Sequence, residues 1–375
     1  MYVAVKGGET AVKNSRKLVA KTRRGPASIP EITTEQIEHQ MGLAVDRVMA
    51  EGALYDRNAA AAAIKQAQGD MVEAIFLVRA FRTTLKRFGN TKPVKTDQMR
   101  VLRRISGVFK DIPGGQILGP TYDYTHRLID FEGEGNGDGD TSFADTGIDD
   151  SDALAERFRT LPWVVDILKK QGLMDDDGET VGDGEAEDLT RRPLKIPANR
   201  DIRLQNLARG DEGFLLASAY SIQRGFGLDR HPFLGELRVG HVDVMYVPPE
   251  LGFEIKIGEI KLTECFMLNR FDGSREKPPG LENGYGLVFG QSERKAMSMA
   301  LLDRSLKTCE QGGEVRYPAQ DQEFILSHSD NVESSGFVQH LKLPHYVDFQ
   351  SELVFLRNLK NGTKAKRKKK VESPV

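Results

Sequence analysis

The sequence predicts an α+β fold, in which a helical N-terminal part packs with an antiparallel sheet and helices in the C-terminal half. Two observations predict this class. Apolar residues recur at helical spacing in the first 90 residues, whereas apolar and polar residues alternate around residues 241–262, as strands do. Between the two parts, residues 132–199 are rich in Gly, Asp and Glu. We predict a flexible, largely disordered acidic insertion there.

Charge is distributed unevenly along the 375 residues, although the net charge is only −2. Residues 132–152 and 175–188 each hold eight acids and no base, and residues 360–370 hold seven bases. Outside these segments 46 bases face 39 acids. The folded body is therefore mildly basic, as a protein that handles phosphorylated ligands would be.

Neither a membrane nor an oxidising compartment is indicated. The longest apolar runs fall far below the roughly 18 residues that a bilayer-spanning helix needs. The N-terminus MYVAVKGGE has no apolar signal core, and Cys265 and Cys309 are too few for a disulfide framework. We expect a cytoplasmic protein without a membrane partner.

The first 90 residues show clear helix boundaries. Thr33 and Gln36 form a capping-box pattern ahead of an amphipathic helix. Asn58 is the expected cap of an alanine-rich helix that ends at Gly69, and Asp70 is the expected cap of the next helix. We predict helices with one buried face each.

The helical pattern ends before residues 103–131, where two prolines and four glycines exclude a long helix. An irregular, aromatic-rich segment of this length is typical of a functional loop. Within the acidic insertion, the apolar run LPWVVDIL predicts one short helix.

The second half begins with a helix across Leu204–Tyr220. The segments HVDVMYV and GFEIKIGEIKL predict antiparallel strands with a bulge at Gly258, and YGLVFG then leads into the helix SERKAMSMALLDRSL. A last helix is expected near Leu353–Leu359. The expected regions are therefore 1–131, 132–199 and 200–359, followed by a disordered basic tail at 360–375.

A nucleotide site of the P-loop kind is excluded, since GxxxxGK[ST] is absent. Three segments are candidate anion sites, because glycines let the backbone approach a phosphate and neighbouring bases add charge. An ordinary capped turn with solvated bases is the alternative for each. The candidate residues are Lys6, Gly7 and Gly8, then Lys110, Gly114 and Gly115, and finally Arg294 and Lys295 after the strand and glycine of 287–290.

Three of the seven histidines lie between positions 328 and 345. Pro344 opposes a helix between His340 and His345, so a loop can bring both imidazoles to one metal ion. Two ligands are too few for a closed zinc site. A third would come from His328, a nearby carboxylate or another chain, and two packing histidines are the alternative.

Several long blocks, in order, resemble the I subunit family of the carbon-phosphorus lyase core complex. They cover about three quarters of the chain and are far more specific than any single motif. The blocks are MYVAVKGGE, AVDRVM, EAIFLVRA, RRISGVFKDIPGGQILGPTYDYTHRL, RGDEGFLLASAYSIQRGFG, GYGLVFGQSERKAMSMALLDR and QDQEFILSHSDNVESSGFVQHLKLPHYVDFQ.

The resemblance implies an enzyme of phosphonate degradation. With partner subunits, members of the family displace adenine from ATP with methylphosphonate, a glycosyl transfer that gives alpha-D-ribose 1-methylphosphonate 5-triphosphate. Alone, they are nucleosidases that release adenine from ATP or guanine from GTP. The acidic stretch of 132–190 and the basic tail match no family motif that we can identify.

The resemblance also implies a cofactor and partners. The intact HLKLPH block assigns zinc binding to His340 and His345, at a contact with the iron-sulfur-bearing J subunit. The expected partners are PhnG, PhnH, PhnJ, PhnK and PhnL, with two copies of this chain in a symmetric core complex. No nucleic acid is expected as a partner.

The sequence contains the residue types that the implied chemistry needs. Cleaving a ribosyl C–N bond develops positive charge at C1′, so the site needs a carboxylate, an acid to protonate the purine, and cations for the triphosphate. We place Lys6, Lys110, Arg294 and Lys295 on the triphosphate. The candidates near the ribose and the base are Asp111, Asp123, His126 and Glu293.

Two other functions stay open on the sequence alone. The chain could be mainly a scaffold that supplies half of an interfacial zinc site. Independently of the resemblance, it could be a metal-dependent hydrolase built around His328, His340 and His345.

Overall fold

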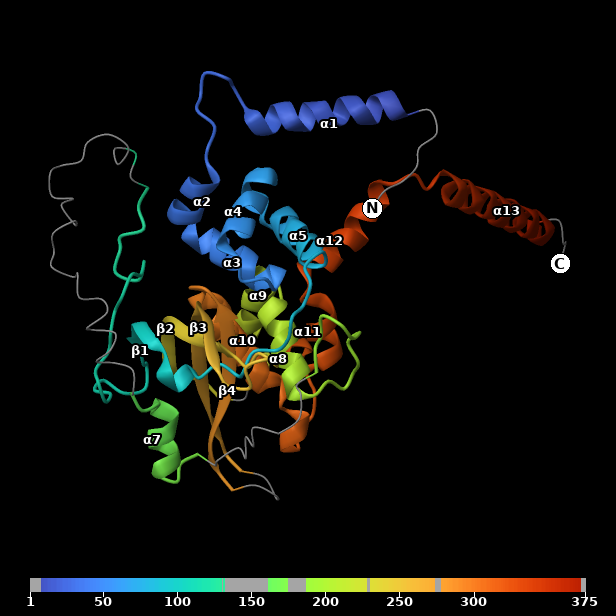
Figure 1. The fold of residues 1–375 in the computed structure, drawn as a ribbon. Coiled ribbons are helices and arrows are strands. Elements are labelled where there is room, and N and C mark those ends of the chain that lie inside the picture. Colours follow the sequence, from blue (N-terminus) through green and yellow to red (C-terminus); the bar gives the residue numbers. More distant parts are fainter. Residues whose placement is uncertain are drawn as a thin grey trace. The chain divides into compact units, whose positions relative to one another are not determined.

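The structure, a computed structural model, describes residues 8–129, 131, 161–174, 187–227, 230–273 and 278–371. It confirms the α+β class, with helices and an antiparallel sheet in the strand order β1-β2-β3-β4 (Figure 1). The helices are α1 (Glu9–Arg24), α2 (Thr34–Gln40), α3 (Gly42–Gly52), α4 (Arg57–Gln66), α5 (Met71–Arg82), α7 (Val164–Lys170), α8 (Arg200–Arg209), α9 (Glu212–Gln223), α10 (Glu293–Leu306), α11 (Gln322–His328), α12 (Asn331–Gln339) and α13 (Tyr346–Val371). The strands are β1 (Arg100–Ile105), β2 (Phe233–Tyr246), β3 (Ile255–Phe271) and β4 (Gly280–Phe289).

The chain divides into two compact units. One consists of residues up to 25 together with residues from 332 onward, and it contains α1, α13 and most of α12. The other, residues 26–331, contains the sheet and the remaining helices. β1, from the expected N-terminal region, belongs to the same sheet as the strands of the C-terminal half.

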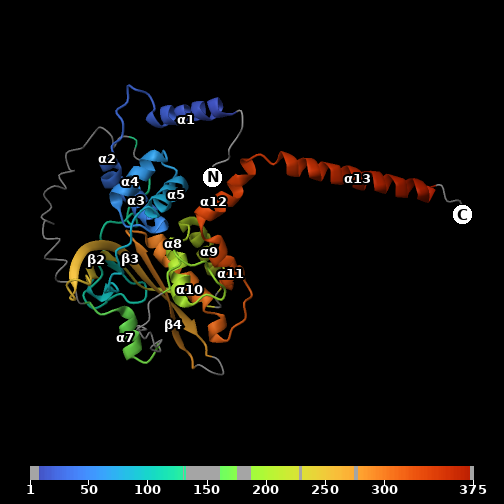
Figure 2. The same cartoon turned by 45° about the vertical axis from the view of Figure 1, so that its right-hand side comes forward.

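Different helices pack on the two faces of the sheet. Side chains alternate along β3, so Cys265 and Met267 lie on one face and Phe266 and Leu268 on the other. The first pair belongs to a core shared with α8, α9 and α10, which Figures 1 and 2 show together beside the sheet. The second pair packs with residues of α7. Gly286 of β4 lets α10 come this close, since a Cβ there would lie 2.1 Å from the carbonyl oxygen of Ala296.

Several local predictions are confirmed in the N-terminal helices. The Thr33 side chain accepts a hydrogen bond from Gln36 N in a complete capping box ahead of α2. Asp70 caps α5 by accepting from two backbone amides. The predicted cap of the alanine-rich helix, Asn58, is wrong. Asp56 accepts from Ala59 N at 2.8 Å instead, because Asp56 is the residue with extended backbone before the first turn.

The predicted helix across Leu204–Tyr220 is two helices, α8 and α9. Gly210 has extended backbone and ends α8, and Asp211 then caps α9 by accepting from Phe214 N at 2.7 Å. Gly210 therefore ends one helix, and Asp211 begins the next. The predicted bulge is confirmed, since Val244 pairs with Gly258 and Met245 with Lys256, which leaves Ile257 as the extra residue.

Parts of the predicted disordered insertion belong to the folded body. The short helix predicted at LPWVVDIL is confirmed as α7, whose Val164, Val165 and Leu168 are buried. Leu189 and Leu194 pack against the core of the sheet and α10. The described residues of the predicted insertion, 161–174 and 187–199, therefore include ordered structure, because these apolar side chains fill a core. Residues 130, 132–160 and 175–186 lie outside the described residues.

The C-terminal helix is longer than predicted. It was expected near Leu353–Leu359, but α13 continues to Val371 through most of the residues that we predicted to form a disordered tail. Lys, Arg and Ala are strong helix formers, so the basic sequence is compatible with this extension. Among the described residues, no helix has both the length and the apolar character that crossing a membrane requires.

Buried charges attach the α7 segment to the sheet. Glu236 of β2, fully buried, accepts from Arg104 Nε at 2.5 Å and from Arg238 Nε at 2.7 Å. The other oxygen of Glu236 accepts from Val164 N at 2.9 Å. Arg238 also lies over the ring of Trp163, 3.4 Å from its centroid. One carboxylate thus compensates two buried guanidinium groups and fixes the start of α7.

Glu236→Gln is expected to lower the free energy of unfolding by about 3–5 kcal/mol, because it leaves two buried cations without their counter-charge. Urea unfolding would measure this loss. Glu254→Gln, at an exposed carboxylate, is the matched control and is expected to change stability by less than about 0.5 kcal/mol. Equal stability of the two variants would contradict this role of Glu236.

Candidate functional site

The predicted strand–glycine–helix turn is confirmed between β4 and α10. Gly290 has φ +73°, and a Cβ there would lie 2.3 Å from the Cβ of Asp46, so only glycine fits. Asp46, on α3, accepts from Gln291 N at 2.8 Å and from Lys261 Nζ at 3.2 Å. The turn that begins α10 is therefore held by a buried carboxylate of the N-terminal helices.

The N-cap residue of α10 does not cap its own helix. The Ser292 hydroxyl donates to Glu212 Oε2 at 3.0 Å, and Ser292 N donates to Thr263 Oγ1 at 3.0 Å. No side chain of the N-cap accepts from the first turn of α10. Amide groups at an uncapped helix start, at the positive end of the helix dipole, favour an anion.

A buried arginine brings two of the predicted catalytic carboxylates together. Arg103 of β1 is 1% exposed, and its guanidinium lies 2.6 Å from Asp123 and 2.8 Å from Glu293. The Asp123 side chain is 48% exposed and that of Glu293 is 20% exposed, so both are accessible from solvent. Gln291 Nε2 donates to Pro120 O at 3.0 Å, which ties the loop of Asp123 to the start of α10.

The other predicted residues of this loop region lie apart from that pair. His126 is exposed three residues after Asp123. Lys110 and Asp111 are exposed, and their side chains make no hydrogen bond or ion pair with the described residues. Gly114 is required by packing, since a Cβ there would lie 2.2 Å from Leu161, whereas Gly115 faces open space.

The structure gives the N-terminal candidates no position relative to this arrangement. Lys6 and Gly7 lie outside the described residues. Gly8 is the N-cap of α1, which belongs to the other unit of the chain.

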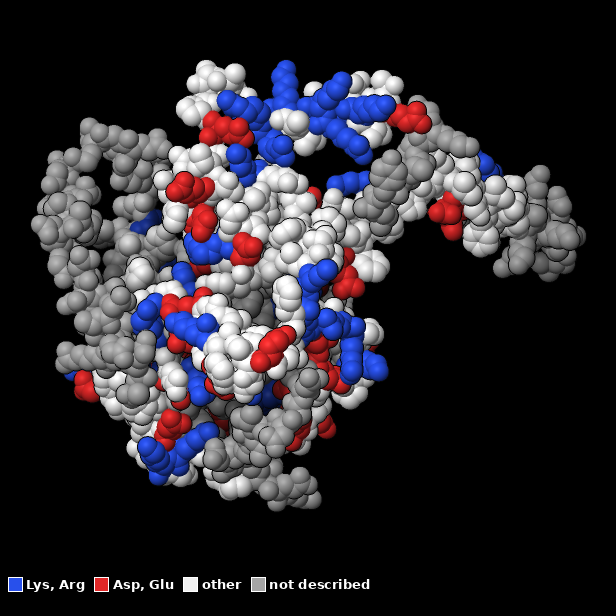
Figure 3. All heavy atoms as spheres, in the orientation of Figure 1, with Lys and Arg blue, Asp and Glu red and all other residues white. Residues whose placement is uncertain are grey.

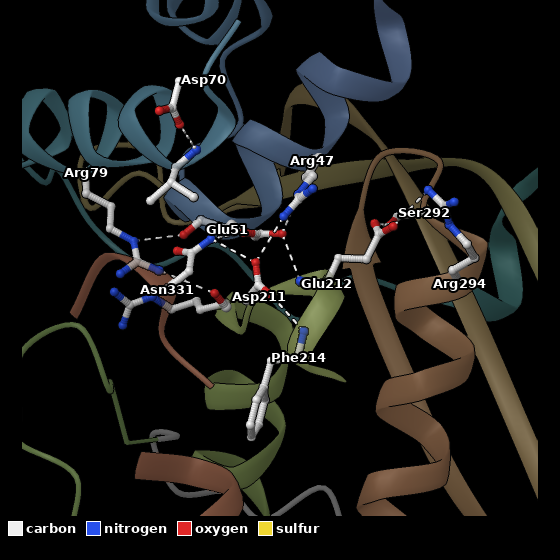
Figure 4. Close-up of polar contacts among 12 residues, drawn as sticks. Arg47, Glu51, Asp70, Arg79, Asp211, Glu212, Phe214, Ser292, Arg294 and Asn331 are labelled. Carbon is white, nitrogen blue, oxygen red and sulfur yellow. Dashed lines mark hydrogen bonds and ion pairs between the residues drawn. The ribbon is translucent and has the colours of Figure 1, made fainter. Parts of the chain in front are cut away.

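Figure 4 shows a network of acids and arginines that extends to Ser292 and Arg294 at the start of α10. Glu51, fully buried on α3, accepts from Arg47 Nε at 2.9 Å, from Glu212 N at 3.1 Å and from Asn331 Nδ2 at 2.8 Å. Asp211 accepts from Arg47 Nη2 at 3.0 Å. The acids therefore connect α3, α9 and the start of α12 within one set of contacts.

The two predicted cations of α10 lie in opposite environments. Arg294 has a 76% exposed side chain and pairs with Glu212 Oε1 at 2.9 Å. Lys295 is fully buried, and its Nζ makes no hydrogen bond with the described residues. Burial lowers the pKa of Lys295 to about 8, against the opposing attraction of Glu51 and Glu212. Arg294 is thus the one of the two that faces solvent at the start of α10.

The predicted histidine pair lies in the other unit. The rings of His340 and His345 have centroids 5.4 Å apart at an interplanar angle of 64°. His345 Nδ1 is 2.7 Å from Leu343 O, and His340 Nδ1 contacts Phe337 O. When each Nδ1–H donates to its carbonyl, the two Nε2 atoms are left as ligands.

His328 belongs to the unit of residues 26–331, whereas His340 and His345 belong to the other unit. It lies on α11, where Nδ1 is 2.7 Å from Phe324 O and the ring packs on Phe324. Among the described residues, no three His, Cys, Asp or Glu side chains form a group that could hold a metal ion.

Sequence reasoning missed the residues that organise the site, namely Arg103, Asp46, Glu51 and Glu212. Their signal was a charged residue at a position that the pattern assigns to the core. Asp46 lies between Val45 and Val48 on the buried face of α3. Such an acid must be paired when buried, which points to a partner elsewhere in the chain.

Comparison with known proteins establishes the family. The family model described as "Bacterial phosphonate metabolism protein (PhnI)" matches residues 1–363. The chain belongs to the PhnI family. It is 56% identical over 360 residues to the alpha-D-ribose 1-methylphosphonate 5-triphosphate synthase subunit PhnI of Rhizobium meliloti, covering 96% of this chain and 95% of the relative. Identity to the PhnI subunit of Escherichia coli is 54% over 363 residues, covering 96% and 98%.

These matches confirm the predicted family over a longer part of the chain. The resemblance rested on about three quarters of the chain, whereas the family match also spans the acidic stretch and the first residues of the basic tail. A role in phosphonate metabolism follows from membership of the PhnI family.

Gly290→Ala is expected to destabilise the protein by about 1–3 kcal/mol more than Gly252→Ala. Both glycines have similar φ values, +73° and +69°, but a Cβ at Gly252 meets nothing within 4 Å. The difference between the two variants therefore isolates the contact with Asp46. Chemical unfolding would measure both, and equal losses would show that Asp46 does not fix this turn.

Proposed function

We propose that this chain carries the site at which adenine is displaced from ATP. With partner subunits, methylphosphonate is the nucleophile and the product is alpha-D-ribose 1-methylphosphonate 5-triphosphate. Alone, water takes that role, and the chain is a nucleosidase for ATP or GTP. The names of the two relatives support the transfer. The observation that supports the site is the pairing of Asp123 and Glu293 on Arg103 beside the start of α10.

The reaction requires negative charge near C1′ of the ribose, because breaking the C–N bond gives C1′ oxocarbenium character. In this proposal Glu293 supplies that charge. It lies on the first turn of a helix, and Arg103 holds its carboxylate from one side. A carboxylate on a rigid element, preorganised by a buried cation, needs little rearrangement as the charge develops.

The departing purine requires a proton. Asp123 and the neighbouring His126 are the candidates, since both lie on the loop that Gln291 ties to the start of α10. The triphosphate would lie against the amide groups of the first turn of α10 and Arg294. Since no phosphoryl group is transferred, the phosphates need recognition only, which agrees with the absence of a P-loop.

Glu293→Gln and Asp123→Asn are each expected to lower adenine release from ATP by about 100-fold or more, the range for an electrostatic or acid–base group. The assay follows free adenine and the ribose triphosphate by chromatography and mass spectrometry. Glu254→Gln, an exposed carboxylate outside the site, is the control and is expected to retain wild-type rates.

Three outcomes separate the parts of the proposal. If the wild-type chain alone releases no adenine, the nucleosidase activity is wrong. If the reconstituted complex then makes the phosphonate ester and both variants lose it, the site assignment holds. If both variants keep the full activity of the complex, the chain is a scaffold and the site lies on a partner.

We also propose that His340 and His345 hold zinc together with ligands of a partner subunit, expected to be the J subunit. Two imidazoles, each with its Nδ1 on a backbone carbonyl, present the ligand type and the fixed tautomer that zinc sites use. Tetrahedral zinc needs four ligands, so two would come from outside this pair. The bound ion would supply a rigid connection between subunits.

His340→Ala in the reconstituted complex is expected to reduce bound zinc at least about 10-fold, the scale of loss for a removed or misoriented ligand. Elemental analysis by mass spectrometry measures the metal. His39→Ala, which removes an exposed histidine of α2, is the control and is expected to leave the zinc content unchanged. Full zinc occupancy in a His340→Ala and His345→Ala double variant would overturn the assignment.

A further inference from the structure

A small polar cavity lies at the opposite end of α10 from the candidate site. Its volume is about 200 Å³, and its walls include residues beside β2, at the end of β3 and on the last turns of α10. Arg304, one of these residues, follows Arg294 by ten positions on the same helix. At 1.5 Å per residue, the two positions are about 15 Å apart, so the cavity is separate from the site proposed for ATP.

Cations dominate the lining of the cavity. Among the described lining residues, Arg230, Arg270 and Arg304 are the cations and Asp272 is the acid. Arg304 also pairs with Glu282, which lies outside the lining, at 2.5 Å. Asp272 accepts from Arg230 Nη2 at 2.6 Å and pairs with Arg270 Nε at 2.7 Å. Each guanidinium has five N–H donors, so these bonds leave donors on both arginines. Convergent guanidinium groups are the residues of choice for phosphate-like oxyanions.

A buried acceptor in the wall adds a second requirement. Asn269 is 1% exposed, and its Nδ2 donates to Arg230 O at 3.1 Å, which fixes the orientation of the amide. Its Oδ1 is buried and accepts no hydrogen bond from the described residues. A buried acceptor of this kind needs a donor. A ligand that fits the cavity must therefore bring both negative oxygens and one hydrogen-bond donor.

We propose that this cavity binds a singly protonated tetrahedral oxyanion of the phosphate class. The charged oxygens contact Arg230, Arg270 and Arg304, and the P–OH group donates to Asn269 Oδ1. Inorganic phosphate and an alkylphosphonate share this chemistry. Sulfate has the same shape and charge, but at neutral pH it carries no proton to donate.

The size of the cavity agrees with this class. A water molecule takes about 30 Å³ of the liquid, so about 200 Å³ accommodates a tetrahedral ion with some water. Cavities for larger organic ligands usually start at about 300 Å³. A whole nucleotide is therefore a poorer fit than a single phosphate or phosphonate group.

Three features oppose an anion, and the first is the Glu282 carboxylate, which pairs with Arg304. Asp272 carries one negative charge, but it is shared between two arginines. The cavity also lies near the carbonyl end of α10, where the helix dipole favours cations. Thr308 Oγ1 donates to Ser305 O at 2.6 Å, which satisfies one of those carbonyls. The three guanidinium groups still outnumber the two carboxylates that pair with them, Asp272 and Glu282, so one positive charge is left for an anion.

Calorimetric titration of the full chain tests the proposal, with inorganic phosphate, methylphosphonate and sulfate at equal ionic strength and pH 7. We expect phosphate and methylphosphonate to compete for one site and sulfate to bind at least 10-fold more weakly. The tighter of the two competitors identifies the source of the ligand. Absence of saturable binding by both would overturn the proposal, whatever the fate of adenine release.

Two variants separate the cavity from general surface charge. Arg270→Gln removes a 60% exposed side chain of the lining, so the fold is preserved, and phosphate binding is expected to weaken at least 10-fold. Arg316→Gln removes a 68% exposed arginine outside the lining and is expected to bind phosphate as wild type does. If both variants bind phosphate equally more weakly, the loss reflects the general surface charge, and the proposed site is overturned.

Asn269→Ala tests the donor requirement. We expect it to narrow the preference for phosphate over sulfate, with a thermal unfolding curve to verify that the variant is folded. An unchanged preference in the folded variant would show that Asn269 does not select the protonated ion.

Discussion

Burial of two carboxylates on one short helix determines how the rest of the site is built. Asp46 and Glu51 of α3 are 1% and 0% exposed, and an unpaired charge at such depth would cost several kcal/mol. Each therefore accepts from donors of distant segments. Asp46 accepts from Lys261 and from the turn before α10, and Glu51 accepts from Glu212 N and from Asn331. The contacts of Asp46 thus attach α3 to β3 and to the turn that follows β4.

This arrangement leaves the start of α10 available for a ligand. Glu51 accepts from the backbone of Glu212, which places the Glu212 carboxylate where Ser292 donates to it. Ser292 is thereby diverted from capping α10, and Asp46 holds the preceding turn in place. A helix whose cap residue is used elsewhere keeps its first amides for an anion, at a position that the buried acids make rigid.

The sequence was sufficient wherever the signal is local. Capping side chains, strand alternation and the strand–glycine–helix turn depend on neighbouring residues, and Thr33, Asp70 and Gly258 were assigned correctly for that reason. Buried charges depend on partners far along the chain, so the role of Arg103 could not be predicted. Its two carboxylates were both predicted, but nothing in their spacing shows that a single guanidinium joins positions 123 and 293.

The candidate site is assembled from segments on both sides of residues 132–160. Arg103 and Asp123 precede residues 132–160, and Glu293 follows them. Arg103 lies on β1, which pairs with β2 in the same sheet as β4, the strand that precedes Glu293. Each doubling of a connecting loop adds only about 0.6 kcal/mol of closure entropy. The pairing of β1 with β2 and the buried hydrogen bonds of Glu236 offset this entropy. The candidate site therefore does not require a short segment between Asp123 and the later strands.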